Sequence, residues 1–545
     1  MKKLFFCNQS LVKKTLMLFT VFFTVISLNA NNVQITNIVN TNPGSANPEI
    51  TFDIKWDNSW NVSGVPNNYD AVWIFVKCQK VPKGTLNCES NLEWEHANMA
   101  NSKAGFSAAA PLTYELVSDS VGLFLYRSSN GTGNIPTTSV TIVLDLPIPD
   151  SPYAKEYNFK VFALEMVYIP EGNFELGDGI SSNTFNSITI NNSISTSTLA
   201  PGVVGGGIHS TIPAEFPKGY SAFYCMKYEI TQQQYVDFLN TLTFNQQITR
   251  TNLNAAQLAT NPGEGGLCAM VGSCINRNSI KLVQHGINNS RPGVFACDYQ
   301  PTPSGAFNSP NDGLTIAMNY LSLADFYAYL DWAGLRAMTN FEFEKIARGP
   351  LARIGNEYIW GTQNITQAQS SELNNPGTAS EVSNTSGKGL AAYAGSGSGG
   401  PLRVGFSATD STTRETSGSS YYGVMNLGGN VWEIVTGGSN FNNNGYKLTY
   451  SNLGNGRLNS AGNHNVANWL TYGSYSYSQV GCGCCASYIK WHIELRGGSY
   501  SSAASTLRTS DRSKNASPPC GSIRDMGFGN AGDKRQADVG GRGVR

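Results

Sequence analysis

The sequence predicts an α+β protein in which an N-terminal β-sandwich precedes a larger module of helices, short strands and long loops. Two observations support this division. Alternating apolar and polar runs, separated by Gly, Pro and Asn, fill residues 31–163, whereas helical start signals occur only beyond residue 230. A chain of 545 residues, 40% of them hydrophobic, is long enough for two or three domains that each have a core.

Five runs in the first part show the period-2 alternation of half-buried strands. They are residues 33–38, 50–54, 72–76, 121–126 and 140–144. Short strands separated by turn residues are typical of an immunoglobulin-like sandwich, which we expect here. The same residues contain no constellation of catalytic side chains, so we expect an adhesive or spacer domain.

Three helices are predicted from capping boxes, in which two side chains three residues apart satisfy backbone N–H groups at the helix start. The pairs are Thr231 with Gln234, Ser322 with Asp325, and Thr339 with Glu342. The first pair predicts a helix over residues 232–242, and Gly334 is expected to end the second helix. These signals concern folding and indicate no chemistry.

The composition argues against two classes of partner. The 37 basic and 37 acidic residues balance, and charged residues make up only 14% of the chain. Such a chain has no electrostatic footprint for nucleic acid or for an anionic membrane surface. We therefore expect an unidentified surface ligand or a protein partner instead.

The N-terminus has the pattern of a secretory signal peptide. Lys2 and Lys3 open a basic region, an apolar stretch covers residues 15–28, and cleavage is expected after Ala30. No later stretch approaches the ~20 apolar residues that span a bilayer. The sequence therefore predicts an exported protein, in the periplasm, at the cell surface or outside the cell, with no transmembrane segment in the mature chain.

The cysteines fit an oxidising compartment. Of the eleven, removal of Cys7 with the signal leaves ten, an even number that permits disulfides. The pairs closest in sequence are Cys78 with Cys88 and Cys268 with Cys274. A Gly-rich loop holds Cys482, Cys484 and Cys485, for which a disulfide-stapled loop and a metal cluster both remain open.

Seven segments follow one another in the order of the motifs of one known family. They are residues 166–177 (MVYIPEGNFELG), 227–235 (KYEITQQQY), 318–326 (MNYLSLADF), 339–349 (TNFEFEKIARG), 358–361 (YIWG), 422–433 (YGVMNLGGNVWE) and 495–500 (LRGGSY). On these motifs the chain resembles the formylglycine-generating enzyme family, also called the sulfatase-modifying factor family. The resemblance implies a C-type-lectin-like mixed α/β domain, rich in irregular loops, over residues 164–545. It would follow a signal peptide at 1–30 and the β-sandwich at 31–163.

A calcium site is expected in the segment 422–433. This segment places the Asn426 amide and the Glu433 carboxylate on either side of a Gly-Gly turn, and Ca²⁺ binds carboxylate, amide and backbone carbonyl oxygens. The family resemblance implies that the ligands are Asn426, Gly429, Val431 and Glu433. The alternative is that Asn426 and Glu433 only cap a buried turn by hydrogen bonding.

The copper site of the family's oxidases is not expected here. Those enzymes convert a substrate cysteine to formylglycine with Cu(I), which two cysteines just after the G-G-S motif hold as thiolates. Here residues 501–512 contain no cysteine, and Ser499 is the only retained residue of the active-site motif. Oxygen ligands do not replace soft thiolates on Cu(I). Cys520, or the cluster at 482–485, could supply sulfur only after a rearrangement of the site.

Two further assignments concern histidine and the C-terminus. The five histidines show no short metal-binding spacing, so an iron site that uses His464 or His492 lacks a supporting motif. Residues 538–545 are favoured as the closing strand over the alternative at 525–529, which makes 525–537 an insertion.

The sequence thus predicts a non-catalytic, exported domain protein that binds a ligand or partner at the cell surface on a calcium-stabilised scaffold. Loops carry recognition in most scaffolds, so the expected binding face comprises residues 501–524 and the insertions 243–312 and 437–490. The first alternative is an active formylglycine-generating oxidase. The second is a structural subunit of a surface or secretion assembly.

Overall fold

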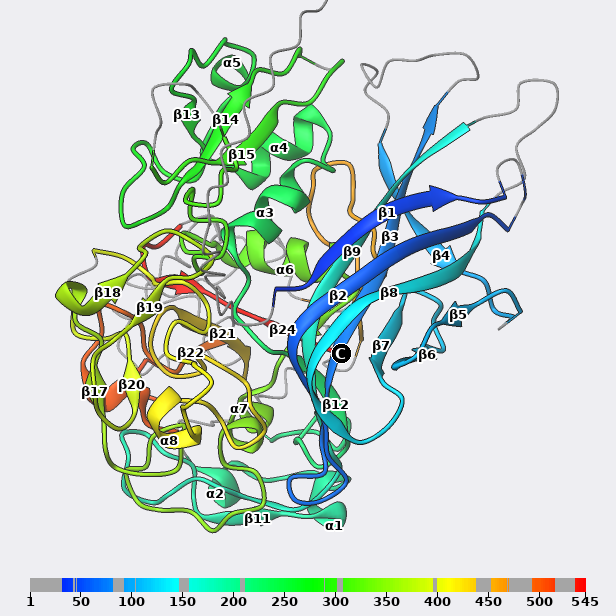
Figure 1. Ribbon diagram of the computed structural model, residues 1–545. Helices are drawn as coiled ribbons and strands as arrows, with labels where there is room; N and C mark the ends of the chain where they lie inside the picture. The colour runs from blue at the N-terminus through cyan, green and yellow to red at the C-terminus, as the bar shows by residue number, and fades with distance from the viewer. Residues whose placement is uncertain are drawn as a thin grey trace, which may run out of the picture.

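Figure 1 shows the computed structural model, which describes residues 32–545 apart from 43–44, 46, 82–92, 103, 147–155, 206–210, 289, 301–306, 396–398, 438–451, 468, 470–492 and 515–534. The N-terminal strands lie together on one side, and the rest of the chain combines short strands, short helices and loops on the other. The fold is therefore mixed α/β, with many strands and few helices. Within these described ranges, no helix has the length and apolar character needed to cross a bilayer.

The N-terminal strands form two layers. They are β1 (Gln34–Asn40), β2 (Glu49–Asn61), β3 (Asp70–Val81), β4 (Trp94–Met99), β5 (Ser107–Ala108), β6 (Leu112–Leu116), β7 (Leu123–Arg127), β8 (Gly131–Asp145) and β9 (Glu156–Ile169). One layer joins β1, β2, β8 and β5, the other joins β6, β7, β3 and β9, and β4 pairs with both β3 and β8. The five predicted strand segments lie in β1, β2, β3, β7 and β8. The immunoglobulin-like connectivity stays a prediction.

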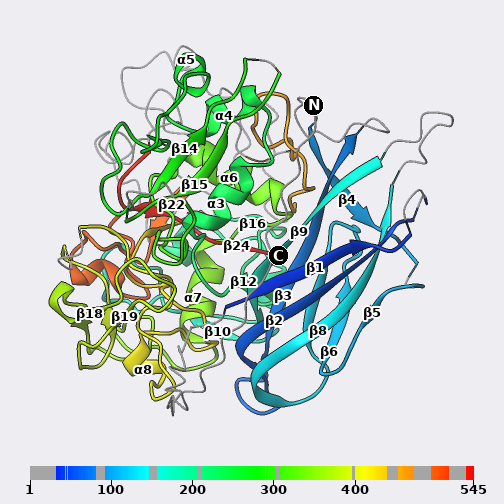
Figure 2. The same cartoon turned by 45° about the horizontal axis from the view of Figure 1, so that its top comes forward.

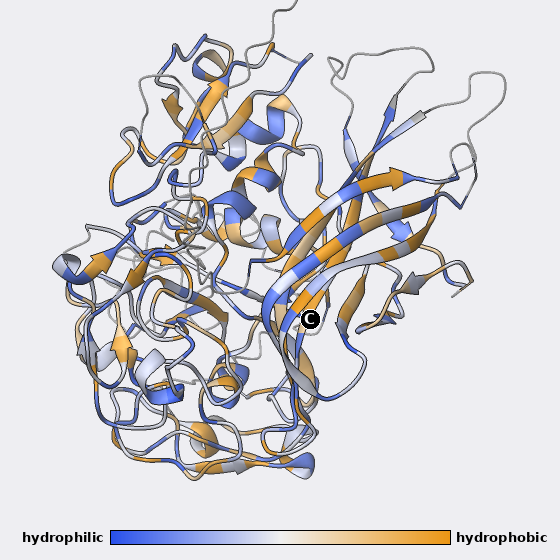
Figure 3. Ribbon diagram, viewed as in Figure 1, coloured by the Kyte–Doolittle hydropathy of each residue, from blue (hydrophilic) through white to orange (hydrophobic). Residues whose placement is uncertain are grey.

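Strand β2 illustrates why the layers pack face to face. Ile50, Phe52, Ile54 and Trp56 are buried, whereas the residues between them are partly or fully exposed. Figure 3 shows the resulting alternation of hydrophobic and hydrophilic residues along β2. One apolar face per strand is buried in the core between the layers.

Strand β3 is buried on both faces. Val72, Ile74 and Val76 join the core between the two β-layers. Trp73 and Phe75 point the other way and pack with helices α3 (Gln232–Leu239) and α6 (Leu323–Trp332) of the second half. A near-continuous apolar run is the pattern expected of a strand that is covered on both sides.

Strand β9 connects the two halves without a break. Residues 156–167 pair with β3, and residues 166–169 pair with β12 (Phe223–Met226), so one sheet continues from the N-terminal layers into the second half. The predicted domain boundary between residues 163 and 164 falls inside this strand. The position of the boundary stays a prediction.

The helices begin where their capping boxes predict. The helices are α1 (Asn192–Ser195), α2 (Pro201–Val204), α3, α4 (Phe244–Arg250), α5 (Ala255–Leu258), α6, α7 (Asn340–Arg348) and α8 (Arg414–Ser417), with 3₁₀ turns η1 (Ser370–Glu372) and η4 (Ala504–Leu507). The boxes at Thr231, Ser322 and Thr339 are all formed. The helix predicted over 232–242 is shorter and ends at Leu239, because Asn240 leaves the helical conformation.

The remaining strands are short. They are β10 (Phe174–Leu176), β11 (Ile188–Ile190), β12, β13 (Leu267–Cys268), β14 (Ile280–Gln284), β15 (Val294–Cys297), β16 (Arg336–Ala337), β17 (Thr366–Gln367), β18 (Leu373–Asn374), β19 (Val382–Ser383), β20 (Leu390–Ala391), β21 (Trp432–Thr436), β22 (Ile493–Arg496), β23 (Val539–Gly540) and β24 (Gly543–Val544). Residues 180–216 contain β11, α1 and α2, and Phe185 and Ile190 contribute to a buried apolar cluster.

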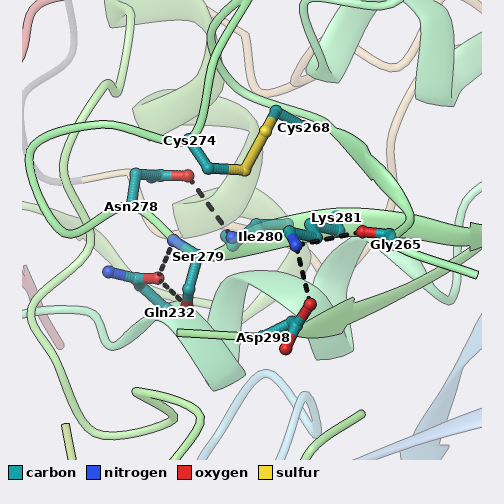
Figure 4. The surroundings of a disulfide bond; sticks show 9 residues. All are labelled: Gln232, Gly265, Cys268, Cys274, Asn278, Ser279, Ile280, Lys281 and Asp298. Carbon is teal, nitrogen blue, oxygen red and sulfur yellow. Dashed lines mark hydrogen bonds and ion pairs between the residues drawn. A yellow bond between two sulfur atoms is a disulfide. The ribbon is translucent and has the colours of Figure 1, made fainter. Parts of the chain in front are cut away.

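The insertion at 243–312 contains α4, α5 and the small sheet β13–β14–β15. The predicted Cys268–Cys274 disulfide is present there, and Figure 4 shows it beside the Lys281–Asp298 ion pair. Cys88, the expected partner of the buried Cys78, lies outside the described residues.

The C-terminal residues return to the seam between the halves, as Figures 1 and 2 show from two directions. Strand β24 lies between β12 and β16, and β23 pairs with β21. The prediction that 538–545 is the closing strand is thus confirmed, whereas the alternative at 525–529 lies outside the described residues. Arg545 places its guanidinium 4.3 Å from the Trp73 ring centroid, so the end of the chain packs against β3.

Asp70, Glu165 and Lys227 are charged side chains that are buried close together at this seam. Glu165 on β9 is 8% exposed, and burial raises its pKa to about 8 in spite of the opposing effect of Lys227. Burial also lowers the pKa of Lys227, which the negative charges of Asp70 and Glu165 partly counteract. The seam therefore contains a carboxyl group that favours its neutral form.

We predict that Glu165 makes the folded state less stable as the pH rises. Its folded pKa of about 8 exceeds the unfolded value near 4.5, so its stabilising effect is complete below pH ~4.5 and is lost as the pH rises through about 8. Each pKa unit corresponds to about 1.4 kcal/mol. Denaturant unfolding at pH 5 and pH 8 should show this loss in the wild type and not in Glu165→Gln.

The matched control is Glu171→Gln, an exposed carboxylate just beyond the end of β9. This variant should keep the pH dependence of the wild type. An unchanged pH dependence in Glu165→Gln would contradict the assignment.

Candidate functional site

The segment 422–433 forms a tight loop that leads into β21. Asn426, Gly429 and Asn430 all have positive φ angles of 54°, 84° and 68°. A Cβ atom at Gly429 would lie 2.5 Å from the carbonyl oxygen of Ala392, so only glycine fits there. The Gly-Gly part of the motif is thus required by a close approach of two backbones.

A buried carboxylate on the preceding motif holds this loop. Glu229 accepts a hydrogen bond from the Asn430 side chain at 2.7 Å and one from the Val431 backbone N–H at 3.1 Å. The Asn430 amide oxygen accepts from the Leu402 backbone N–H at 2.7 Å. The two motifs that contain Glu229 and Asn430 are therefore locked together in the interior.

Glu433 is paired with an arginine from the C-terminal strand region. Both side chains are fully buried, and Arg542 Nε donates to Glu433 Oε1 at 2.6 Å. Arg542 also donates to the Met425 carbonyl at 2.9 Å. Burial raises the pKa of Glu433, and Arg542 opposes this shift by its charge and hydrogen bonds. Glu229, Glu433 and Arg542 thus form a buried cluster with two carboxylates and one guanidinium.

The four expected calcium ligands all lie in this loop or at the start of β21. Asn426 Oδ1 accepts a 2.5 Å hydrogen bond from the Gly405 N–H, and the Gly429 N–H donates to the Gly497 carbonyl at 2.8 Å. The second carboxylate oxygen of Glu433 is buried and has no hydrogen-bond partner among the described residues. A free carboxylate oxygen and an amide oxygen with a spare lone pair are ligands that Ca²⁺ prefers, so the residues fit such an ion.

Hydrogen bonds in the structure also agree with the capping alternative. Asn426 and Glu433 do make hydrogen bonds that fix the turn, as that alternative requires. Within the described ranges, no three His, Cys, Asp or Glu side chains gather as a metal site. The expected calcium set contains only one such side chain, so this result does not decide between the two interpretations.

The G-G-S motif lies directly against the loop. Gly497 and Gly498 follow β22, and a Cβ atom at Gly497 would meet the Leu427 carbonyl oxygen at 2.3 Å. Ser499 comes next and is fully buried. The glycines thus bring Ser499 beside the loop of Asn426.

Ser499 is surrounded by oxygen atoms. Its hydroxyl lies 2.7 Å from the Ser502 hydroxyl and donates to Asp538 Oδ2 at 2.9 Å. Ser501 donates to the same carboxylate oxygen at 2.7 Å. We refer to Ser499, Ser501, Ser502 and Asp538 as the hydroxyl cluster. Hydroxyl and carboxylate oxygens are hard ligands and do not suit Cu(I).

The cysteines that the structure describes are either buried thiols or members of a disulfide. Cys225 lies on β12, where burial raises its pKa to about 12, and burial raises the pKa of Cys78 to about 11. Cys268 and Cys274 form the disulfide. The cysteines at 482, 484, 485 and 520 lie outside the described residues, so the prediction about them remains untested.

The histidines give no iron site in the described part of the chain. His464 packs with its ring centroid 5.8 Å from that of Tyr327 and 5.3 Å from that of Trp469. His96 is buried at the seam beside Lys77. His492, the other histidine of the iron hypothesis, lies outside the described residues.

A buried charge cluster beside the G-G-S motif is not evident from the sequence. Glu344 on α7 accepts from Arg512 at 2.9 Å, lies 3.5 Å from Arg496 and forms a 3.1 Å ion pair with Arg348. These guanidinium groups lower the pKa of Glu344 in spite of its burial. Arg496 belongs to the L-R-G-G-S segment, so this cluster anchors that segment to α7. The helical spacing of buried residues in the sequence can indicate Glu344, but it does not indicate its arginine partners.

A comparison with known proteins agrees with this architecture. A family model for the sulfatase-modifying factor enzyme 1-like domain matches residues 158–533. The match begins in β9 and includes all seven motifs, and no curated protein matches the chain. The chain belongs to the formylglycine-generating enzyme, or sulfatase-modifying factor, family.

Proposed function

We propose that this protein is an exported, non-catalytic member of the family that binds a ligand or protein partner at the cell surface. The observation that carries the proposal is the hydroxyl cluster. Ser499 keeps its motif position, but its neighbours Ser501, Ser502 and Asp538 supply oxygen where the family's oxidases need sulfur. Because Cu(I) requires soft ligands, we infer that the scaffold is retained for binding.

Export is supported by two features. Residues 1–30 have the pattern of a secretory signal peptide, and the Cys268–Cys274 disulfide is a bond that persists in oxidising compartments. We further propose that the N-terminal layers form an immunoglobulin-like sandwich and that the second half has the C-type-lectin-like fold of the family. In this fold, the loops that recognise the ligand would extend from a rigid scaffold.

The experiment that tests the proposal measures copper and turnover. The exported protein, whose first residue after cleavage should be Asn31 by mass spectrometry, is loaded anaerobically with Cu(I). It is then incubated with O₂ and a cysteine-containing peptide. We expect less than stoichiometric copper and no formylglycine in the peptide, because the hydroxyl cluster offers no thiolate. An uncleaved chain would contradict export.

Stoichiometric Cu(I) together with formylglycine formation would contradict the non-catalytic proposal. The matched control is a variant with Cys482, Cys484 and Cys485 replaced by Ser. If copper binds to the wild type and not to this variant, the loop that carries these cysteines supplies the thiols, and the oxidase alternative holds.

We also propose that Ca²⁺ stabilises the scaffold through Asn426, Gly429, Val431 and Glu433. The support is the unpartnered buried oxygen of Glu433 and the excess of buried carboxylates over guanidinium groups in its cluster. An ion bound only to the folded state raises its stability by about 2.7 kcal/mol at a hundredfold excess over Kd. A chelator should therefore lower the Tm by several degrees, and Ca²⁺ should restore it.

The diagnostic variant is Asn426→Gly, because glycine tolerates the positive φ of 54° while the amide oxygen is removed. Its Tm should respond little to the chelator. Asn375→Gly, at an exposed residue with a φ of 50°, is the matched control and should respond like the wild type. The same Tm with and without chelator in the wild type would exclude the site.

A further inference from the structure

A cavity lies at the seam between the two halves. Its volume is about 490 Å³, which is within the usual range for small-molecule sites. The end of β2 supplies Trp60 on one side, and the start of the loop 422–433 supplies Tyr422 and Met425 on the other, with Tyr421 beside them. We refer to it as the seam pocket. None of its lining residues belongs to the hydroxyl cluster.

The walls of the seam pocket are fixed by contacts between the halves. Asn68 donates from its side chain to the Tyr422 carbonyl at 2.8 Å, and Trp60 Nε1 donates to Asn68 Oδ1 at 3.3 Å. A Cβ atom at Gly423 would lie 3.3 Å from the Trp60 ring, so the glycine permits this close approach. The pocket is therefore preformed, and a ligand does not have to order its walls.

The side chain of Lys227 lines the same pocket. Lys227 is only 5% exposed, and its ammonium lies 4.3 Å from the Trp60 ring centroid and 5.7 Å from that of Tyr228. It forms no hydrogen bond or ion pair with any residue that the structure describes. Its backbone is held on both sides, because its N–H donates to the Glu165 carbonyl and its carbonyl accepts from the Met425 N–H, both at 2.9 Å.

The nearby carboxylates do not satisfy this ammonium. Asp70 accepts hydrogen bonds from Trp56 at 2.9 Å, from Ser59 at 2.7 Å and from the Trp60 backbone at 2.9 Å. Glu165 accepts from the Val33 N–H. In the described part of the chain, neither Asp70 nor Glu165 forms a hydrogen bond or ion pair with the Lys227 ammonium. A lysine ammonium carries three N–H donors, and those of Lys227 can therefore bind an acceptor that enters the seam pocket.

We propose that the seam pocket binds a small molecule with a flat apolar body and a carboxylate group. The carboxylate accepts hydrogen bonds from the Lys227 ammonium, which are about twice as strong as those between neutral groups. The flat body packs against the rings of Tyr421 and Tyr422 and the side chain of Met425. An active oxidase could have the same pocket, so this proposal does not depend on the copper experiment.

The test compares two probes of nearly the same size and shape, one with a carboxylate and one with a neutral carboxamide. Indole-3-acetate has the proposed chemistry, and indole-3-acetamide is its neutral counterpart. Isothermal titration of the full exported protein should show that the acid binds about tenfold or more tightly than the amide, the difference expected for a charge-assisted hydrogen bond. In Lys227→Met, which keeps an apolar chain of similar length, this preference should disappear.

Lys388→Met is the matched control, because Lys388 is an exposed lysine on the surface, and it should keep the preference of the wild type. Equal affinity of the wild type for both probes, or binding of neither, would overturn the proposal. A preference that survives in Lys227→Met would overturn it as well. If that variant does not fold, the difference in affinity of the wild-type protein for the two probes still tests the proposal.

Discussion

The structure depends on two strands, β3 and β9, that belong to both halves at once. Side chains from opposite faces of β3 enter two separate cores, and β9 continues from the N-terminal layers to its pairing with β12. A strand buried on both faces cannot lose either cover without exposing large apolar side chains such as Trp73 to water. The N-terminal layers are therefore a structural part of the second half and more than an appended spacer.

This constraint determines where a ligand can bind. The turn that follows β2 is held against the motif loop because β3 fixes its position, and the seam pocket forms between them. Glu229 and Arg542 form hydrogen bonds with the backbone of the same loop, and Ser499 lies beside it. Family motifs thus build a frame around Ser499, whose neighbours are the hydroxyl groups of Ser501 and Ser502.

The sequence predicts local features well and distant contacts poorly. The capping boxes at Thr231, Ser322 and Thr339, and the Cys268–Cys274 disulfide, join residues that are close in the chain, so their spacing alone identifies them. The Glu344–Arg512 pair spans 168 positions, and Lys227 meets Trp60 from the other half. No periodicity or motif encodes such contacts, because they arise only when segments far apart in the chain fold together. The continuity of β9 across the expected domain boundary has the same origin.

Differential scanning calorimetry of the full exported protein tests the shared-strand account most directly. If β3 and β9 join the halves into one cooperative unit, unfolding should occur in a single transition whose calorimetric and van't Hoff enthalpies agree. Two separate transitions, one for the N-terminal layers and one for the family domain, would contradict the account.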